Sequence, residues 1–264
     1  MLFSKTLESV RSSGSGLIAD VGEDWSQGRA TFGGMVAALG NEAMRRQVPL
    51  DRPLRGLNVT FVAPVTPGLV HINARVLRVG KVVTIAQAEL ISADTVGATM
   101  TGIYGSARTT AIMIEPARGD AADGAEDLPE AAYPPALGGP AFLQHFALRW
   151  AEGTRPFTAT PLKRSKAYIR HREAGTIGES QVVALVDVIP TPVLQMMSKP
   201  APASSLVWTL EMLRHDYQFD ADAWWRIDTD VPSSKDGYAS QNSVLLNPAG
   251  VPMALSQQLV AVFG

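Results

Sequence analysis

Four consecutive segments in the first half of the chain are runs of apolar and polar residues rich in the residue types that favour β-strands. They are residues 55–64, 68–81, 82–94 and 97–108. Short turns that contain glycine separate them. Before these segments, residues 33–47 have the apolar spacing of a helix, which Gly33 and Gly34 open. The pattern predicts one helix followed by an antiparallel meander over residues 1–114.

The same order returns after residues 115–139, a segment rich in Ala, Pro, Gly and acidic residues that shows no periodicity. We interpret this segment as a linker that builds no packed core. After it, the pattern predicts a strand over 164–173 and an apolar helix over about 180–197, bent by Pro190 and Pro192. Further strands are predicted over residues 204–216, 223–231, 237–250 and 251–264. Residues 140–264 therefore repeat the first half.

Composition excludes several classes of function. The chain has 264 residues, of which 46% are hydrophobic, with 23 basic residues against 25 acidic ones. No Lys/Arg-rich run with interleaved aromatics occurs, so nucleic acid is not an expected partner. The chain has no cysteine, which excludes disulfides and thiolate nucleophiles and is typical of a reducing, cytoplasmic compartment. No apolar run approaches membrane-spanning length, and the four histidines lack metal-ligand spacing, so neither a membrane nor a metal is expected.

Four motifs, in their order along the chain, resemble the double-hotdog acyl-CoA thioesterases, specifically the acyl-CoA thioesterase II-like group. They are "TFGGMVAALG" at the helix start, "FVAPVTPGLVHINARVLRVGK" after it, the Arg-x-Gly turn at 78–80, and the C-terminal "ALSQQLVAVFG". The resemblance implies an α+β double hotdog: two tandem repeats, each an antiparallel sheet wrapped around a long helix. It also implies hydrolysis of acyl-CoA to free acid and CoA in fatty acid metabolism. No cofactor is expected, because CoA belongs to the substrate.

The family's catalytic residues, carried over by position, fall in the second half. Its acid falls on Asp187, near the end of the aliphatic stretch "QVVALVDVIP", and its glutamine falls on Gln258. Its hydroxyl residue falls on Ser205, where relatives carry Thr. Thr209 is the alternative hydroxyl residue, since residues four apart in a regular strand face the same side. Thr209 is also expected to contact the substrate. Asp187 would activate water, Gln258 would hold the water or the carbonyl oxygen, and Ser205 would orient Asp187. The other chemical route is a covalent acyl-aspartate intermediate.

The first half has lost its acid. In single-hotdog relatives the acid stands seven residues after the second glycine, and that position here is Asn41, whereas seven residues after the expected helix cap Ser180 comes Asp187. We therefore expect one working site per chain. Gly33 and Gly34 are predicted to let the substrate approach backbone amides at the helix start. Asn58 is predicted to line the pocket.

Other interpretations stay open at this point. The simplest alternative for Asp187 is a residue without a catalytic role, which faces solvent or pairs with an arginine. The corresponding alternative for the protein is a non-catalytic acyl-CoA-binding hotdog protein. A third alternative is an enoyl-CoA hydratase-type hotdog. Arg75, Arg78 and Lys81 are either contacts for CoA phosphates or solvated surface charge. Acyl-CoA is the expected small-molecule partner, and assembly into a homo-oligomer is an expectation by analogy alone.

Overall fold

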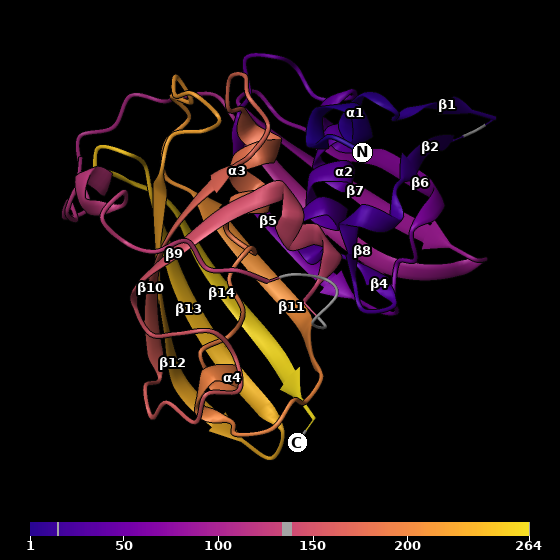
Figure 1. Cartoon of the computed structure of the whole chain (residues 1–264). Coiled ribbons are helices and arrows are strands. Elements are labelled where there is room, and N and C mark those ends of the chain that lie inside the picture. The colour runs from indigo at the N-terminus through magenta and orange to yellow at the C-terminus, as the bar shows by residue number, and fades with distance from the viewer. Residues whose placement is uncertain (15, 134–138, 264) are drawn as a thin grey trace. The chain divides into compact units, whose positions relative to one another are not determined.

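A computed structural model of the chain describes residues 1–14, 16–133 and 139–263, and the chain divides into two units (Figure 1). Unit 1 takes residues Met1–Glu115, Tyr133–His145 and Gly178–Ala184. Unit 2 takes the segments Pro116–Ala132, Phe146–Ile177 and Leu185–Gly264. Of the predicted linker, 115–139, residues 134–138 lie outside the described residues, as does Gly264 at the end of the predicted second half.

The sheet of unit 1 contains the four strands predicted from the β-rich runs. They are β5 (Leu54–Phe61), β6 (Gly68–Val79), β7 (Val83–Ser92) and β8 (Thr95–Gly105). The order in the sheet is β1-β2-β6-β7-β8-β5, and neighbouring strands are antiparallel. The sequence pattern missed β1 (Arg11–Ser13), β2 (Gly16–Val21) and the short helix α1 (Phe3–Glu8), because each is too short to show a period.

The predicted first helix is confirmed as α2 (Gly33–Arg45), which lies against β6, β7 and β8. On β7 every second residue is buried, so this strand turns one face to the helix. Gly40 faces β8 at close range: a Cβ on this residue would collide with the sulfur of Met100. The missing side chain therefore lets the helix approach the sheet and bury the apolar face of β7.

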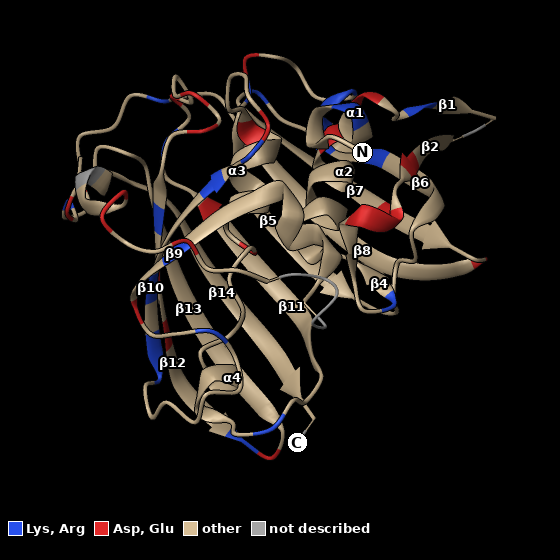
Figure 2. Cartoon of the chain, viewed as in Figure 1, with Lys and Arg blue, Asp and Glu red and all other residues tan. Residues whose placement is uncertain are grey.

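The sheet of unit 2 has the order β11-β14-β13-β12-β10-β9, again with antiparallel neighbours. Its predicted strands are confirmed as β10 (Arg164–His171), β11 (Ala203–Met212), β12 (Trp225–Lys235), β13 (Tyr238–Leu246) and β14 (Pro252–Val262). The edge strand β9 (Phe146–Glu152) was not predicted. Figure 2 shows that β13 and β14 carry no charged residue along their length.

The expected long helix over residues 180–197 is wrong. The structure has α3 (Glu179–Leu185) and, after seven intervening residues, the single turn α4 (Val193–Met196). Pro190 and Pro192 lack the N–H that a helix interior needs, and each disfavours helical geometry in the residue before it. The chain between α3 and α4 is therefore non-helical, and Asp187 lies in the turn that follows α3.

The expectation that residues 115–139 build no packed core is also wrong for the part that the structure describes. Ala125 is fully buried against Ala147, Tyr168 and Trp224 of unit 2. The carboxylate of Glu126 accepts a hydrogen bond of 2.6 Å from Nε1 of Trp224, and this bond lowers the pKa of Glu126. Specific contacts of single residues hold this segment in place. Such contacts produce no repeating hydrophobic pattern, so the sequence does not indicate them.

Within residues 1–14, 16–133 and 139–263, no helix is both long enough and apolar enough to span a bilayer.

Candidate active site

Asp187 is a half-buried carboxylate placed by the end of α3. The helix stops at Leu185, whose carbonyl accepts a bond from the amide of Val188 at 3.3 Å. Val186 and Val188 on either side of Asp187 are both buried, so their side chains anchor the turn in the apolar interior. The turn therefore holds a carboxylate at a fixed place facing the sheet of unit 2.

Gln258 of β14 reaches this carboxylate. Its Nε2 donates a hydrogen bond of 2.8 Å to Oδ1 of Asp187. Gln258 is only 4% exposed, and its neighbour Gln257 on the same strand is exposed, as the alternation of a β-strand requires. The buried member of the glutamine pair is thus the one that contacts the acid.

Ser205 of β11 completes a line of three residues. Its hydroxyl donates to Oε1 of Gln258 at 3.0 Å. Because an ionised carboxylate only accepts hydrogen bonds, the NH₂ end of Gln258 faces Asp187, and the oxygen end of the amide is left to accept the bond from Ser205. Ser205 was expected to orient Asp187; in the structure it holds Gln258, which in turn holds the acid. The structure brings these three predicted residues together inside unit 2.

A β-bulge decides which hydroxyl of β11 shares a face with Gln258. Ser205 lies opposite Val260, but the register shifts before Val207, which lies opposite Leu259. The extra residue between them changes the alternation, so that Thr209 pairs with Gln257 and lies on the other face of the sheet. The expectation that Ser205 and Thr209 face the same side is therefore wrong, while a substrate contact by Thr209 stays a prediction.

Asn41, which stands where the resemblance places an acid in single-hotdog relatives, is a fully buried amide in unit 1. Its Nδ2 donates to Oε1 of Glu179 at 3.0 Å and to Oγ of Ser180 at 3.3 Å. Its Oδ1 accepts a 2.8 Å bond from the hydroxyl of Tyr104, and burial raises the pKa of that phenol far above its usual value. Asn41 is thus saturated with protein partners.

Glu179, which the sequence did not single out, organises this cluster. Its second oxygen accepts the backbone N–H of Leu54 at 2.8 Å, and Nε of Arg45 lies 3.6 Å from its first oxygen. Ser180 was expected to cap α3, but it is the second residue of this helix. An acidic residue ahead of an apolar run is a common helix start, so only its distant partners were hidden in the sequence.

The predicted substrate contacts Gly33, Gly34 and Asn58 all lie in unit 1. Gly33 and Gly34 begin α2, as expected, and a Cβ on Gly34 would lie 2.9 Å from the carbonyl oxygen of Ala184. Only glycine permits this close approach. Asn58 is exposed on β5, on the face opposite to that of the buried Leu57. Their contact with substrate stays a prediction.

The cations proposed for CoA are exposed. Arg75 donates to Oε1 of Gln87 at 2.9 Å, while Arg78 and Lys81 are exposed near the end of β6. These positions fit either interpretation, so a contact with CoA phosphates stays a prediction.

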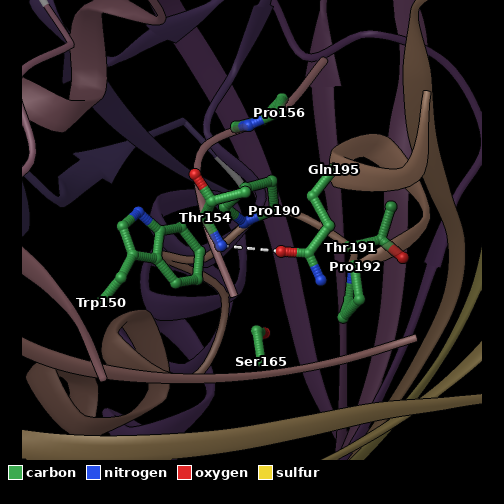
Figure 3. Close-up of a pocket in the computed structure, with 8 residues that line it drawn as sticks. All are labelled: Trp150, Thr154, Pro156, Ser165, Pro190, Thr191, Pro192 and Gln195. Carbon is green, nitrogen blue, oxygen red and sulfur yellow. Dashed lines mark hydrogen bonds between the residues drawn. The ribbon is translucent and has the colours of Figure 1, made fainter. Parts of the chain in front are cut away.

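Two hollows are found among the described residues of unit 2. One is a narrow gap lined by residues of β9, β10 and α4 and of the segments that precede β10 and α4, and Gln195 accepts the amide of Thr154 across it at 2.8 Å (Figure 3). No water-sized sphere fits inside it. The other, of 470 Å³, is lined by Met196, Met197, Ser198, Lys199, Pro200, Ala201 and Phe263. Only the second has the size of an ordinary ligand site.

Known proteins with this fold are thioesterases in several cases. The chain is similar to a hot dog-fold protein of unknown function from Alicyclobacillus acidocaldarius (18% identity, 99% and 98% of the two chains, TM-score 0.88). It is also similar to a putative thioesterase II from Thermobifida fusca (17%, 99% and 97%, 0.80) and an acyl-CoA thioesterase II from Mycobacterium marinum (15%, 99% and 98%, 0.77). These likenesses confirm the predicted α+β double-hotdog fold.

The sequence itself matches a family. Residues 21–105 match the acyl-CoA thioesterase N-terminal domain, and residues 125–262 match the acyl-CoA thioesterase C-terminal domain. A search of curated proteins gave no match. The C-terminal match alone covers more than half of the 264 residues. The chain therefore belongs to the acyl-CoA thioesterase family, whose members are thioester hydrolases.

Proposed function

We propose that this chain hydrolyses acyl-CoA thioesters at Asp187, with Gln258 and Ser205 as its supporting residues. The observation that carries the proposal is the line of hydrogen bonds from Ser205 to Gln258 to Asp187. A half-buried carboxylate that a neutral amide holds in a fixed position can accept a proton from water, because the amide donates a hydrogen bond without neutralising its charge. Such an arrangement suits a general base.

The reaction follows from these roles. Asp187 takes a proton from water while the water oxygen attacks the thioester carbonyl carbon, and the carbonyl oxygen becomes negative. The C–S bond then breaks, and the CoA thiolate receives the proton that Asp187 holds. The products are the free acid and CoA.

Gln258 has a second hydrogen on Nε2 that the bond to Asp187 does not use. We assign this hydrogen to the attacking water or to the developing oxyanion, where a fixed donor in a dry site is most effective. Ser205 acts through Gln258 and is a positioning residue. The scheme uses water and side chains alone, without a resident metal or redox cofactor.

The test is thiol release from a panel of acyl-CoAs, from acetyl to palmitoyl together with phenylacetyl and benzoyl, for the wild type and Asp187→Asn. Asparagine keeps the shape but cannot take the proton, so turnover should fall by about 10²–10⁴-fold while acyl-CoA affinity persists. Turnover that survives in the variant would reject Asp187 as the base. Tight binding without thiol release in the wild type would instead support the acyl-binding alternative.

A mass spectrum of enzyme quenched during turnover separates the two chemical routes. Unmodified protein is the expected result, because water is the proposed nucleophile. An added acyl mass on the peptide that contains Asp187 would establish the covalent route.

The cellular setting that we propose is cytoplasmic fatty acid metabolism. The absence of cysteine supports a reducing compartment, and acyl-CoA substrates support the pathway class. Self-association into a homo-oligomer remains a proposal by analogy, which light scattering of the purified protein would test.

A further inference from the structure

Four buried hydroxyl residues form a row across the inner face of the unit 2 sheet, the face that carries Gln258. Cross-strand pairs connect Ser165 of β10 to Thr229 of β12, Thr229 to Ser243 of β13, and Ser243 to Ser256 of β14. All four are at most 6% exposed. We call these residues the hydroxyl row. Because directly opposed residues share a face, the row runs continuously from β10 to β14.

Gln241 extends this polar surface to the candidate active site. It lies on β13 directly opposite Gln258 and two residues from Ser243, so all three face the same side. Gln241 is 3% exposed, and its Oε1 has no hydrogen-bond partner among the residues that the structure describes. A buried acceptor left without a donor destabilises the folded protein. This atom therefore requires an explanation.

The fold itself does not require polar residues at these places. In unit 1 the corresponding central strands are β7 and β8, and their buried central residues are Ala86, Ala88, Leu90, Ala98 and Met100. This apolar surface packs against α2. The centre of the unit 1 sheet is therefore apolar, with the buried polar residues Thr84 and Ser92 only towards the ends of β7, whereas the centre of the unit 2 sheet carries a row of polar residues next to Asp187.

Protein partners satisfy only part of the polar surface. Thr229 and Ser243 share a hydrogen bond of 2.8 Å, and Ser256 accepts one of 2.9 Å from Nε1 of Trp208. The hydroxyl of Ser165, at the far end of the row, has no partner within the described part of the chain. Both ends of the polar surface, Gln241 Oε1 and Ser165 Oγ, therefore keep unused hydrogen-bonding capacity.

We propose that unit 2 is built for acyl groups that carry a hydroxyl near the thioester, with Gln241 as its acceptor. The inference rests on the proposed function, because it takes Asp187 and Gln258 to mark the thioester carbonyl. Directly opposed residues have Cβ atoms roughly 4.5–5.5 Å apart, so Gln241 reaches substituents on the first few carbons of the acyl chain. An acceptor-only oxygen requires a donor, and a hydroxyl supplies one where a plain hydrocarbon chain does not.

The test compares kcat/KM for matched thioesters that differ by one hydroxyl: butyryl-CoA against (R)- and (S)-3-hydroxybutyryl-CoA, and decanoyl-CoA against the 3-hydroxydecanoyl-CoAs. In the wild type, one hydroxylated enantiomer should be preferred by at least about tenfold, because a site that hydrogen-bonds a hydroxyl discriminates against the analogue without it. A preference for the plain chain, or no preference, would overturn the inference. This comparison needs no substitution.

Gln241→Met tests the residue itself, since methionine has a similar shape without the acceptor. The ratio of hydroxylated to plain kcat/KM should fall toward one. The matched control is Gln257→Met, the same substitution on the exposed face of β14, which should keep the wild-type ratio. Thermal unfolding checks that both variants fold. An equal loss for both substrates in Gln241→Met would assign the residue to the hydrolytic water and overturn the inference.

Binding separates this inference from the proposed function. In the Asp187→Asn variant, titration calorimetry with the same pairs of thioesters should show the preference for the hydroxylated chain without turnover. If the wild type releases no thiol from any thioester, or if Asp187→Asn remains active, the proposed function fails, and the binding preference still tests the hydroxyl site. If thiol release depends on Asp187 but neither assay shows a preference, only the present inference fails.

Discussion

Nε2 of Gln258 lies 2.8 Å from Oδ1 of Asp187, across a separation of 71 residues in the chain. The contact joins the centre of a strand to the turn that follows a helix, so it depends on the correct packing of unit 2. It also turns two residues that are unremarkable alone into a pair with a defined geometry.

Replacing Gln258 by Ala should lower kcat about 10²–10³-fold, because the variant loses the amide that fixes Asp187 and a fixed donor in the dry site. Thiol release under saturating acyl-CoA measures the effect. Gln257→Ala is the control, as this exposed neighbour points to the other face. Equal losses in both variants would argue against a specific role for Gln258.

Ser205→Ala should reduce kcat by roughly tenfold, with a smaller change in KM, since Gln258 loses the donor that orients its amide. Ser205→Thr keeps a hydroxyl and should retain most of the activity. Ser204→Ala removes an exposed hydroxyl next to it and serves as the control. A failure of threonine to rescue would point to packing rather than hydrogen bonding at this position.

Asn41→Asp should destabilise the protein by roughly 2–4 kcal/mol without raising activity. The substitution removes two donated bonds and places a carboxylate beside that of Glu179, in a fully buried site. Denaturant unfolding measures the loss, and Asn73→Asp on the exposed side of β6 is the control. Increased thiol release in Asn41→Asp would mean that the first half kept a second site.

His145 should make stability fall in mild acid. Its ring stacks on Trp25 with centroids 3.8 Å apart, and burial lowers its pKa although Asp24 opposes the shift. A histidine with a lowered pKa in the folded state contributes stability above its unfolded pKa of about 6.5, and this contribution is lost as the pH falls through the folded pKa.

The measurement is the unfolding midpoint between pH 8 and pH 5 for the wild type and His145→Phe, which keeps an aromatic ring but does not titrate. The wild type should lose more stability than the variant over this range. His71→Gln, at an exposed position on β6, should leave the slope unchanged. A steeper slope in His145→Phe would reverse the assigned sign.

The sequence predicted those features that repeat. Strands such as β7 and β13, of ten and nine residues, lie within β-rich runs that turn residues bound, and the helix α2 shows its period over 13 residues. The identity of the acid and the glutamine could be carried over because they stand in motifs of fixed spacing. These elements depend on local pattern, which one sequence contains in full.

Features that depend on one residue or on distant partners could not be predicted. The bulge between Ser205 and Val207 changes the face of every later residue of β11, yet no repeating pattern in the sequence indicates it. Gln241 looks like any polar strand residue until its burial is known. Glu126 and Ala125 lie in a segment whose packing depends on Trp224, which is far away in the chain.

The exchange of segments between the two units has a consequence for folding. The chain passes from unit to unit five times, and the segment Gly178–Ala184 belongs to unit 1 although it lies deep in the second repeat. A fragment that ended at residue 114 would lack Glu179, and the amides of Leu54 and Asn41 would lose their acceptor. The boundary between the two sequence repeats therefore does not coincide with the boundary between the two units, and a cut at residue 114 would remove hydrogen-bond partners that unit 1 uses.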